Sequence, residues 1–130
     1  MPFRDLAERL AEVRARIDDA RGRGGHGQPV TIVAVTKTYG PEAPLAAWDA
    51  GLRDVGENKV QEAIAKMPQV GVPIRWHLIG HLQRNKVRQI DAFHLVHSMD
   101  SARLADAVAS HGTARGRPVE VLAQLNVSGE

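Results

Sequence analysis

Lys37 is the residue whose position in the sequence most suggests chemistry. It lies just beyond residues 30–35, a β-branched and apolar run that carries no charge. Such a run is typical of a parallel strand covered by helices. An amine that follows a rigid strand can carry function, because loop residues on a rigid scaffold do so more often than core residues. From position alone, a solvated loop lysine remains the alternative interpretation.

Polar residues also follow the other predicted strands. The carboxyl ends of parallel strands meet at one rim of an α/β fold, so we expect these side chains to share that rim with Lys37. Asn58 and Asp100 also have a purely structural interpretation, because each could be the N-cap of the helix that follows it. The set supplies carboxylates, amides, hydroxyls and an imidazole, but no grouping that defines one reaction by itself. Its members are Glu57, Asn58, His81, Gln83, Ser98, Asp100, Asn126 and Ser128.

Histidines and a basic run raise two further hypotheses. His94 and His97 stand three residues apart on a predicted strand and would point to opposite faces, so we expect no metal site there. The basic residues of 83–88 could contact phosphate, although a solvated first helical turn explains them as well. The sequence contains no phosphate-binding glycine motif and no nucleophile-elbow motif.

The order of predicted elements indicates the architecture. An amphipathic first helix carries Leu6, Leu10, Val13 and Ile17, and a glycine-rich loop at 21–29 follows it. Five strands alternate with helices after that loop, which predicts βαβ units and a parallel sheet, either doubly wound or the start of a β/α barrel. We expect strands at 30–35, 52–55, 74–80, 93–99 and 119–127. We expect helices at 41–50, 59–67, 85–90 and 101–113, with Ile64 and Ala105 among the inward residues.

Composition limits the class of protein. With 130 residues, 43% hydrophobic and 25% charged, the chain is expected to form one globular domain over 1–130. A net charge of +2 gives little support for nucleic-acid binding. The absence of cysteine excludes disulfides and thiolate metal sites and fits a reducing compartment. The first twenty residues lack the apolar core of a secretory signal, and no apolar run spans a bilayer, so we expect a cytoplasmic protein.

Five segments together resemble one family in their order and spacing. The family is that of the pyridoxal phosphate homeostasis proteins, also called alanine-racemase N-terminal-domain-like proteins, which are related to fold-type III pyridoxal phosphate enzymes. The resemblance covers nearly all of residues 3–130. The segments are VAVTKTYG (33–40), VGENKVQE (55–62), RWHLIGHLQRNK (75–86), HSMDS (97–101) and QLNVSGE (124–130).

The resemblance implies a (β/α)8 barrel that holds pyridoxal 5′-phosphate as a Schiff base on Lys37. At the mouth of such an apolar barrel the amine is expected to be partly desolvated, which favours the neutral form that attacks an aldehyde. The resemblance also implies a role in vitamin B6 homeostasis without robust catalysis, with pyridoxal phosphate-dependent apoenzymes as candidate partners. By position, Asn58, His81, Ser98 and Asn126 would line the cofactor rim as wall residues without a chemical role.

The sequence ends after the fifth predicted strand, where the family continues through three more βα units that hold the cofactor phosphate. We therefore expect about five βα units of an incomplete barrel, the N-terminal part of a longer protein. The full-length protein is expected to be a monomer, whereas open sheet edges favour association of the shorter chain.

Two other functions remain open from the sequence. A fold-type III racemase or decarboxylase would use Lys37 but needs a second acid or base across the ring, which no residue here identifies. An interaction or phosphate-binding module would use the basic residues at 84–88.

Overall fold

The computed structural model describes residues 3–129 and contains one parallel sheet of five strands. Neighbours in the sheet are neighbours in the chain, in the order β1-β2-β3-β4-β5. A doubly wound sheet reverses its strand order at a switch point, whereas a barrel adds each strand beside the last. The sheet therefore has the topology of a β/α barrel, which confirms that prediction. The strands are β1 (Ala34–Val35), β2 (Asp54–Glu57), β3 (Arg75–Leu78), β4 (Leu95–Met99) and β5 (Val121–Ala123).

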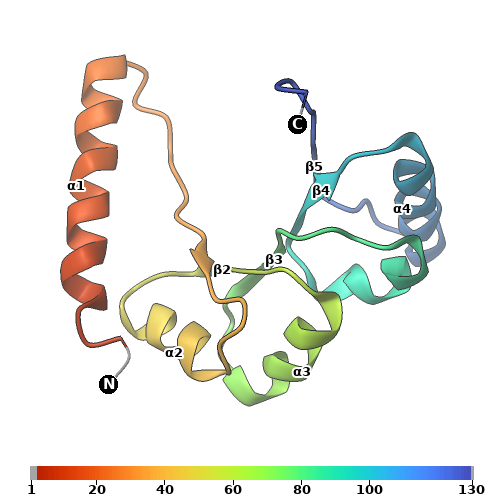
Figure 1. Ribbon diagram of the computed structural model, residues 1–130, viewed down its shortest axis with the longest axis horizontal. Coiled ribbons are helices and arrows are strands. Elements are labelled where there is room, and N and C mark those ends of the chain that lie inside the picture. The colour runs from red at the N-terminus through yellow and green to blue at the C-terminus, as the bar shows by residue number, and fades with distance from the viewer. Residues whose placement is uncertain (1–2, 130) are drawn as a thin grey trace.

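Helical segments connect the strands. In Figure 1, α2, α3 and α4 lie along one side of the curved row of strands, and α1 stands beyond β1. Within residues 3–129, no helix is long and apolar enough to cross a membrane. The segments are α1 (Leu6–Gly24), α2 (Glu42–Asp49), α3 (Val60–Val70), the 3-10 helix η1 (Arg84–Ala92) and α4 (Ala102–Arg115).

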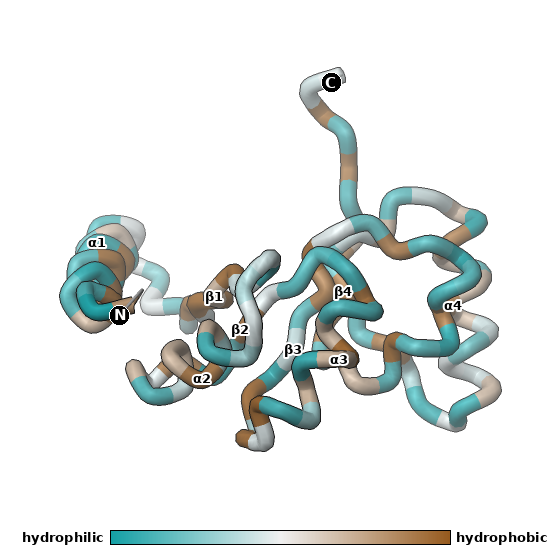
Figure 2. The backbone as a smooth tube through the Cα atoms, turned by 60° about the horizontal axis from the view of Figure 1, so that its bottom comes forward, coloured by the Kyte–Doolittle hydropathy of each residue, from teal (hydrophilic) through white to brown (hydrophobic). Residues whose placement is uncertain are grey.

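The core forms where the strands face the helices. Val55 and Leu78 are fully buried and Val96 nearly so, and they share one apolar cluster with Ala63 of α3 and Ile90 of η1. Figure 2 shows hydrophobic residues gathered along the strands, while α1 is hydrophilic over much of its surface. The tight packing of this layer fixes the strands whose carboxyl ends carry the candidate site.

The edge strands are shorter than the sequence predicted. β1 contains only Ala34 and Val35, since its ladder pairs these two residues with Val55 and Gly56 of β2. Val30, at the start of the predicted strand, is half exposed. β5 likewise spans three residues instead of the nine expected at 119–127. An apolar or alternating run indicates that residues favour a strand conformation. The strand itself extends only as far as the neighbouring strand provides backbone hydrogen-bond partners.

On each of α3 and α4, one residue predicted to point inward is exposed, whereas Val60, Leu104 and Val108 are buried as predicted. Ile64 is 38% exposed, and Lys66 takes the inner position on α3 because its ammonium group finds a buried carboxylate. On α4, Ala105 is exposed whereas Leu104 and Val108 are buried. Residues 84–92 form a 3-10 helix and not the expected α-helix at 85–90.

The predicted N-caps also differ from the observed ones. Ser101, not Asp100, caps α4, because the Leu104 N–H donates to Ser101 Oγ at 3.2 Å. Lys59, in extended conformation, precedes α3 without a side-chain capping bond, so Asn58 is not the N-cap.

Truncation of the core should be costly. Leu78→Ala removes a fully buried side chain, so we expect it to lower the free energy of unfolding by about 2–5 kcal/mol. Leu125→Ala, at a side chain that is 78% exposed, is the matched control and should change it by less than about 0.5 kcal/mol. Urea unfolding followed by circular dichroism measures both, and equal effects would contradict the assigned core.

Candidate functional site

Lys37 lies in a tight turn directly after β1. The Thr36 N–H donates to the Gly56 carbonyl at 3.0 Å, and the Tyr39 N–H donates to the Thr36 carbonyl at 3.3 Å, which closes the turn. Thr38 has φ 68°, the only positive φ of a non-glycine residue in the part of the chain that the structure describes. A β-branched residue rarely adopts this conformation, and such strain persists only where the surroundings hold it.

A buried polar network lies against this turn. The Thr36 hydroxyl donates to the carboxylate of Glu57, which is fully buried at the end of β2. Lys66 Nζ, on α3, lies 2.8 Å from Glu57 Oε1 and 3.1 Å from the Thr36 carbonyl oxygen. Buried charges require partners, and here each ion has the other. The sequence interpretation missed Lys66, although it falls on the same helical stripe as Val60, Ala63 and Val70.

The side chain of Lys37 is exposed. The desolvation expected at the mouth of an apolar barrel is therefore not provided by residues 3–129. An exposed primary amine on a held turn is nevertheless accessible to a small aldehyde, so the residue fits a ligand of that class.

The rim at the carboxyl ends of β2 and β3 is built by close backbone packing, and Lys37 does not line the hollow that this rim encloses. The Ile79 N–H donates to the Glu57 carbonyl at 2.9 Å, which keeps the ends of β2 and β3 together. A Cβ at Gly80 would lie 2.8 Å from Asn58 Cα and closer still to the Asn58 carbonyl oxygen, so only glycine allows this approach. The hydroxyl of the buried Ser98 donates to the Gly80 carbonyl at 2.6 Å. Ser98 thus supports the rim through Gly80.

The structure brings some of the predicted site residues together. Asn58, Gly80, His81 and Gln83 line a hollow of about 370 Å³ at the rim. His81 is exposed, and its Nδ1 lies 3.8 Å from Asp100 Oδ2 at the exit of β4. Asn126 lies apart from this group, in the exposed segment that extends past β5 (Figure 1), where its Oδ1 accepts a bond from the Gly129 N–H at 3.0 Å.

A second polar cluster occupies the opposite ends of the strands. Arg75 binds Asp54 through two bonds of 2.8 Å, and Asp54 Oδ1 lies 2.9 Å from His77 Nε2. His77 Nδ1 lies 2.9 Å from His97 Nε2. A carboxylate can only accept, so His77 donates its Nε2–H to Asp54, and the Nδ1 of a neutral His77 then accepts the Nε2–H of His97. In β/α barrels, chemistry gathers at the carboxyl ends of the strands and the amino ends serve stability, so we assign this cluster to stability.

This cluster corrects one expectation about the histidines. His94 and His97 both lie beside His77, with ring centroids at 5.5 and 5.1 Å. They do not diverge, because His94 precedes β4 and the alternation of side chains applies only within a strand. Among the described residues, no three His, Asp or Glu side chains are arranged to hold a metal ion.

Asp54 and His97 of this cluster have lowered pKa values. The bonds from Arg75 hold the pKa of Asp54 below its ordinary value of 3.8, against the opposing effect of burial. Burial lowers the pKa of His97 below 6.5, and the neighbouring His77 adds to the effect. Both shifts favour the protonation states that the hydrogen-bond chain needs.

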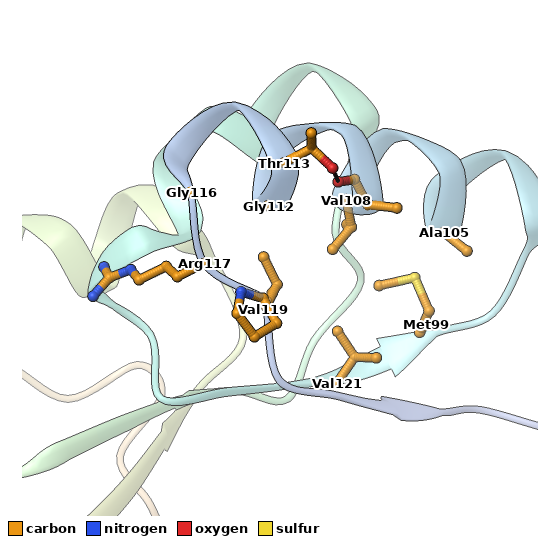
Figure 3. A pocket seen from close by; sticks show the side chains of 11 residues that line it. Met99, Ala105, Val108, Gly112, Thr113, Gly116, Arg117, Val119 and Val121 are labelled. Atoms are coloured by element: carbon orange, nitrogen blue, oxygen red, sulfur yellow. Dashed lines mark hydrogen bonds between the residues drawn. The ribbon is translucent and has the colours of Figure 1, made fainter.

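A larger cavity lies elsewhere. About 570 Å³ in volume, it sits between α4 and β5, where Figure 3 shows Met99, Val119 and Val121 opposite Val108. Its lining is mainly apolar and contains none of the strand-end polar residues, so it offers no chemistry connected with Lys37.

Parallel βα units in barrel order, with an accessible lysine at the end of the first strand, define a β/α barrel class of protein. Comparison with known families specifies it further. The family described as alanine racemase, N-terminal domain, matches residues 9–130. The chain belongs to this family.

Individual relatives are consistent with the family. The chain is 42% identical over 129 residues to the pyridoxal phosphate homeostasis protein of Pseudomonas aeruginosa, covering 96% of this chain and 56% of that protein. Its fold matches PipY of Synechococcus elongatus PCC7942, solved with PLP bound, with a TM-score of 0.79, 35% identity and coverage of 94% of this chain and 55% of that one. The chain thus spans little more than half the length of these relatives.

A more distant match shows the fold alone. The histidine racemase of Leuconostoc mesenteroides aligns with a TM-score of 0.58 and 18% identity, over 70% of this chain and 26% of that one.

The close approach at Gly80 can be tested by adding one methyl group. Gly80→Ala must push the Asn58 backbone away, so we expect a loss of about 1–3 kcal/mol in the free energy of unfolding. Gly22→Ala on α1 meets nothing within 4 Å and should instead gain about 0.5–1 kcal/mol. Urea unfolding compares the two, and a neutral Gly80→Ala would show that the two loops are not in contact.

The polar cluster should make stability depend on pH in two steps. The unfolded chain binds a proton at His97 near 6.5 before the folded chain does, so the free energy of unfolding falls as the pH drops below that value. It falls again below about 3.8, where the unfolded chain protonates Asp54 first.

Urea unfolding across this pH range measures both steps. We expect His97→Asn to flatten the first step and Asp54→Asn to flatten the second. His26→Asn, at an exposed loop histidine, is the control and should leave the profile unchanged. Profiles identical to the wild type in all three variants would refute the assignment.

Proposed function

We propose that this chain is the pyridoxal 5′-phosphate-binding part of a protein of vitamin B6 homeostasis and that Lys37 holds the cofactor as a Schiff base. The observation that carries this proposal is the accessible amine of Lys37 on a held turn at the end of β1. Support comes from PipY, a relative at 35% identity whose structure was solved with PLP bound.

The chemistry of attachment needs little from the protein. The neutral amine of Lys37 attacks the aldehyde carbon, a C=N bond forms, and water leaves. When bound, the cofactor supplies an electron sink. The chain's own part is to fix the turn that carries the amine and to shape the neighbouring rim. For that rim we propose Asn58, His81 and Ser98, with Ser98 acting from behind through the Gly80 carbonyl. We also propose Asn126 for the cofactor site, although it stands apart from these residues on the segment after β5.

We propose binding without catalysis. Racemisation needs an acid or base on each face of the ring, at positions fixed relative to the reacting carbon. Tyr39 belongs to the same short turn as Lys37 and cannot be placed reliably across the ring from it. The curated relatives at 42% and 39% identity carry names that describe homeostasis.

The wider setting is part of the same proposal. The full-length protein would work in the cytoplasm as a monomer, would use neither nucleic acid nor membrane, and would serve pyridoxal phosphate-dependent apoenzymes. The cysteine-free sequence fits a reducing compartment.

Covalent attachment is tested by adding pyridoxal 5′-phosphate to the purified chain, recording the imine absorption band, reducing with borohydride and mapping the adduct by peptide mass. We expect the adduct on Lys37 in preference to Lys59, Lys86 and the N-terminal amine. Lys37→Ala should abolish the band. Lys37→Arg should abolish it too while keeping the positive charge, which separates imine formation from electrostatic attraction. Equal labelling of all exposed amines would contradict the proposal.

The same samples distinguish binding from catalysis. Incubation of the loaded chain with alanine in deuterated water should give no Cα exchange above a protein-free control. Exchange that disappears in Lys37→Ala would identify an enzyme instead.

A further inference from the structure

Two charged side chains buried beneath the Lys37 turn have no part in the attachment chemistry. Glu57 is fully buried, Lys66 is 8% exposed, and the distance between Oε1 and Nζ is 2.8 Å. Removing two ions from water is costly, and apolar residues of similar volume often stabilise a fold as well or better. Stability of the fold alone is therefore a weak reason for an ion pair at this position.

Both members of the pair bind Thr36, the residue that precedes Lys37. Lys66 Nζ donates to the Thr36 carbonyl at 3.1 Å, and the Thr36 hydroxyl donates to the Glu57 carboxylate. The Thr36 N–H is bound to the Gly56 carbonyl at 3.0 Å. Every polar atom of Thr36 is thus fixed by β2 or α3.

The contact continues from Thr36 into the turn that carries the amine. The carbonyl oxygen held by Lys66 also accepts the Tyr39 N–H, the bond that closes the turn around Lys37. Thr38, inside this turn, has a backbone conformation that a β-branched residue rarely adopts. A strained turn of this kind needs an anchor, and the buried pair is the anchor that it contacts.

We propose that Glu57 and Lys66 are positioning residues: through Thr36 they hold the turn that presents the Lys37 amine to an aldehyde ligand. The ligand in this statement rests on the proposed function, whereas the positioning of the turn does not. Glu57 and Lys66 act through Thr36, on the side of the sheet that α3 covers. They take no part in forming the bond between Lys37 and the ligand.

The first test needs no ligand. Amide hydrogen exchange at Tyr39 should accelerate about threefold to tenfold in Glu57→Gln, Lys66→Met and Thr36→Val, because each variant weakens or removes a hydrogen bond that holds Thr36 in place. Thr36→Ser retains the hydroxyl and should exchange like the wild type. Thr36→Val keeps the volume of the side chain and leaves the ion pair in place, so it decides the question even where Lys66→Met does not fold.

The second test measures presentation of the amine. In each folded variant, the ratio of borohydride-trapped pyridoxal phosphate on Lys37 to that on Lys59 should fall at least about threefold, the equivalent of one weakened hydrogen bond. Arg23→Met breaks an exposed ion pair with Asp19 on α1 and is the matched control. It should leave both readouts unchanged.

The outcomes separate the two proposals. Variants that keep the wild-type midpoint in urea, Tyr39 exchange rate and Lys37 to Lys59 ratio would overturn the positioning role. Faster exchange at Tyr39, combined with a wild-type chain that forms no adduct on Lys37, would uphold the positioning role and refute the assigned ligand.

Discussion

The ion pair between Glu57 and Lys66 links three parts of the chain that are distant in sequence. It joins the end of β2 to α3 and, through Thr36, to the end of β1. An uncompensated charge in this place would be far more costly than the pair itself, so neither residue can be lost alone without penalty. Lys66 takes the inner position on α3 while Ile64 is exposed, and we propose that the same two charges hold the Lys37 turn through Thr36.

The two ends of the sheet have different physical tasks. At the carboxyl ends, Gly80 allows two loops to touch and Ser98 binds the Gly80 carbonyl, which gives a rim of fixed shape. The accessible amine of Lys37 follows β1 at the same ends of the sheet. At the amino ends, a chain of bonds from Arg75 through Asp54 and His77 reaches His97 and holds three strands in register. This division is typical of β/α barrels, where chemistry gathers at one face and stability at the other.

The architecture could be predicted from the sequence because apolar runs separated by helical segments report a parallel sheet, and the segment around GENKVQE identified the family. The contacts that anchor the Lys37 turn could not be predicted from the sequence. A lysine at position 66 is normally solvated, and only the three-dimensional placement of Glu57 makes it an inner residue. The helical periodicity of apolar residues predicted that Ile64 points inward and gave no sign of Lys66. Such a pattern is read from apolar side chains alone, so it cannot show that a charged side chain has a buried partner. The lengths of β1 and β5 depend on their neighbours in the ladder, which local propensity does not contain.

A crystal structure of the chain with pyridoxal 5′-phosphate, reduced with borohydride, tests the central claim most directly. The account predicts a covalent bond from Lys37 Nζ to the cofactor, with Thr36 still bound by Glu57 and Lys66. A cofactor attached to Lys59 or Lys86, or attached to Lys37 on a turn that has separated from the ion pair, would contradict it.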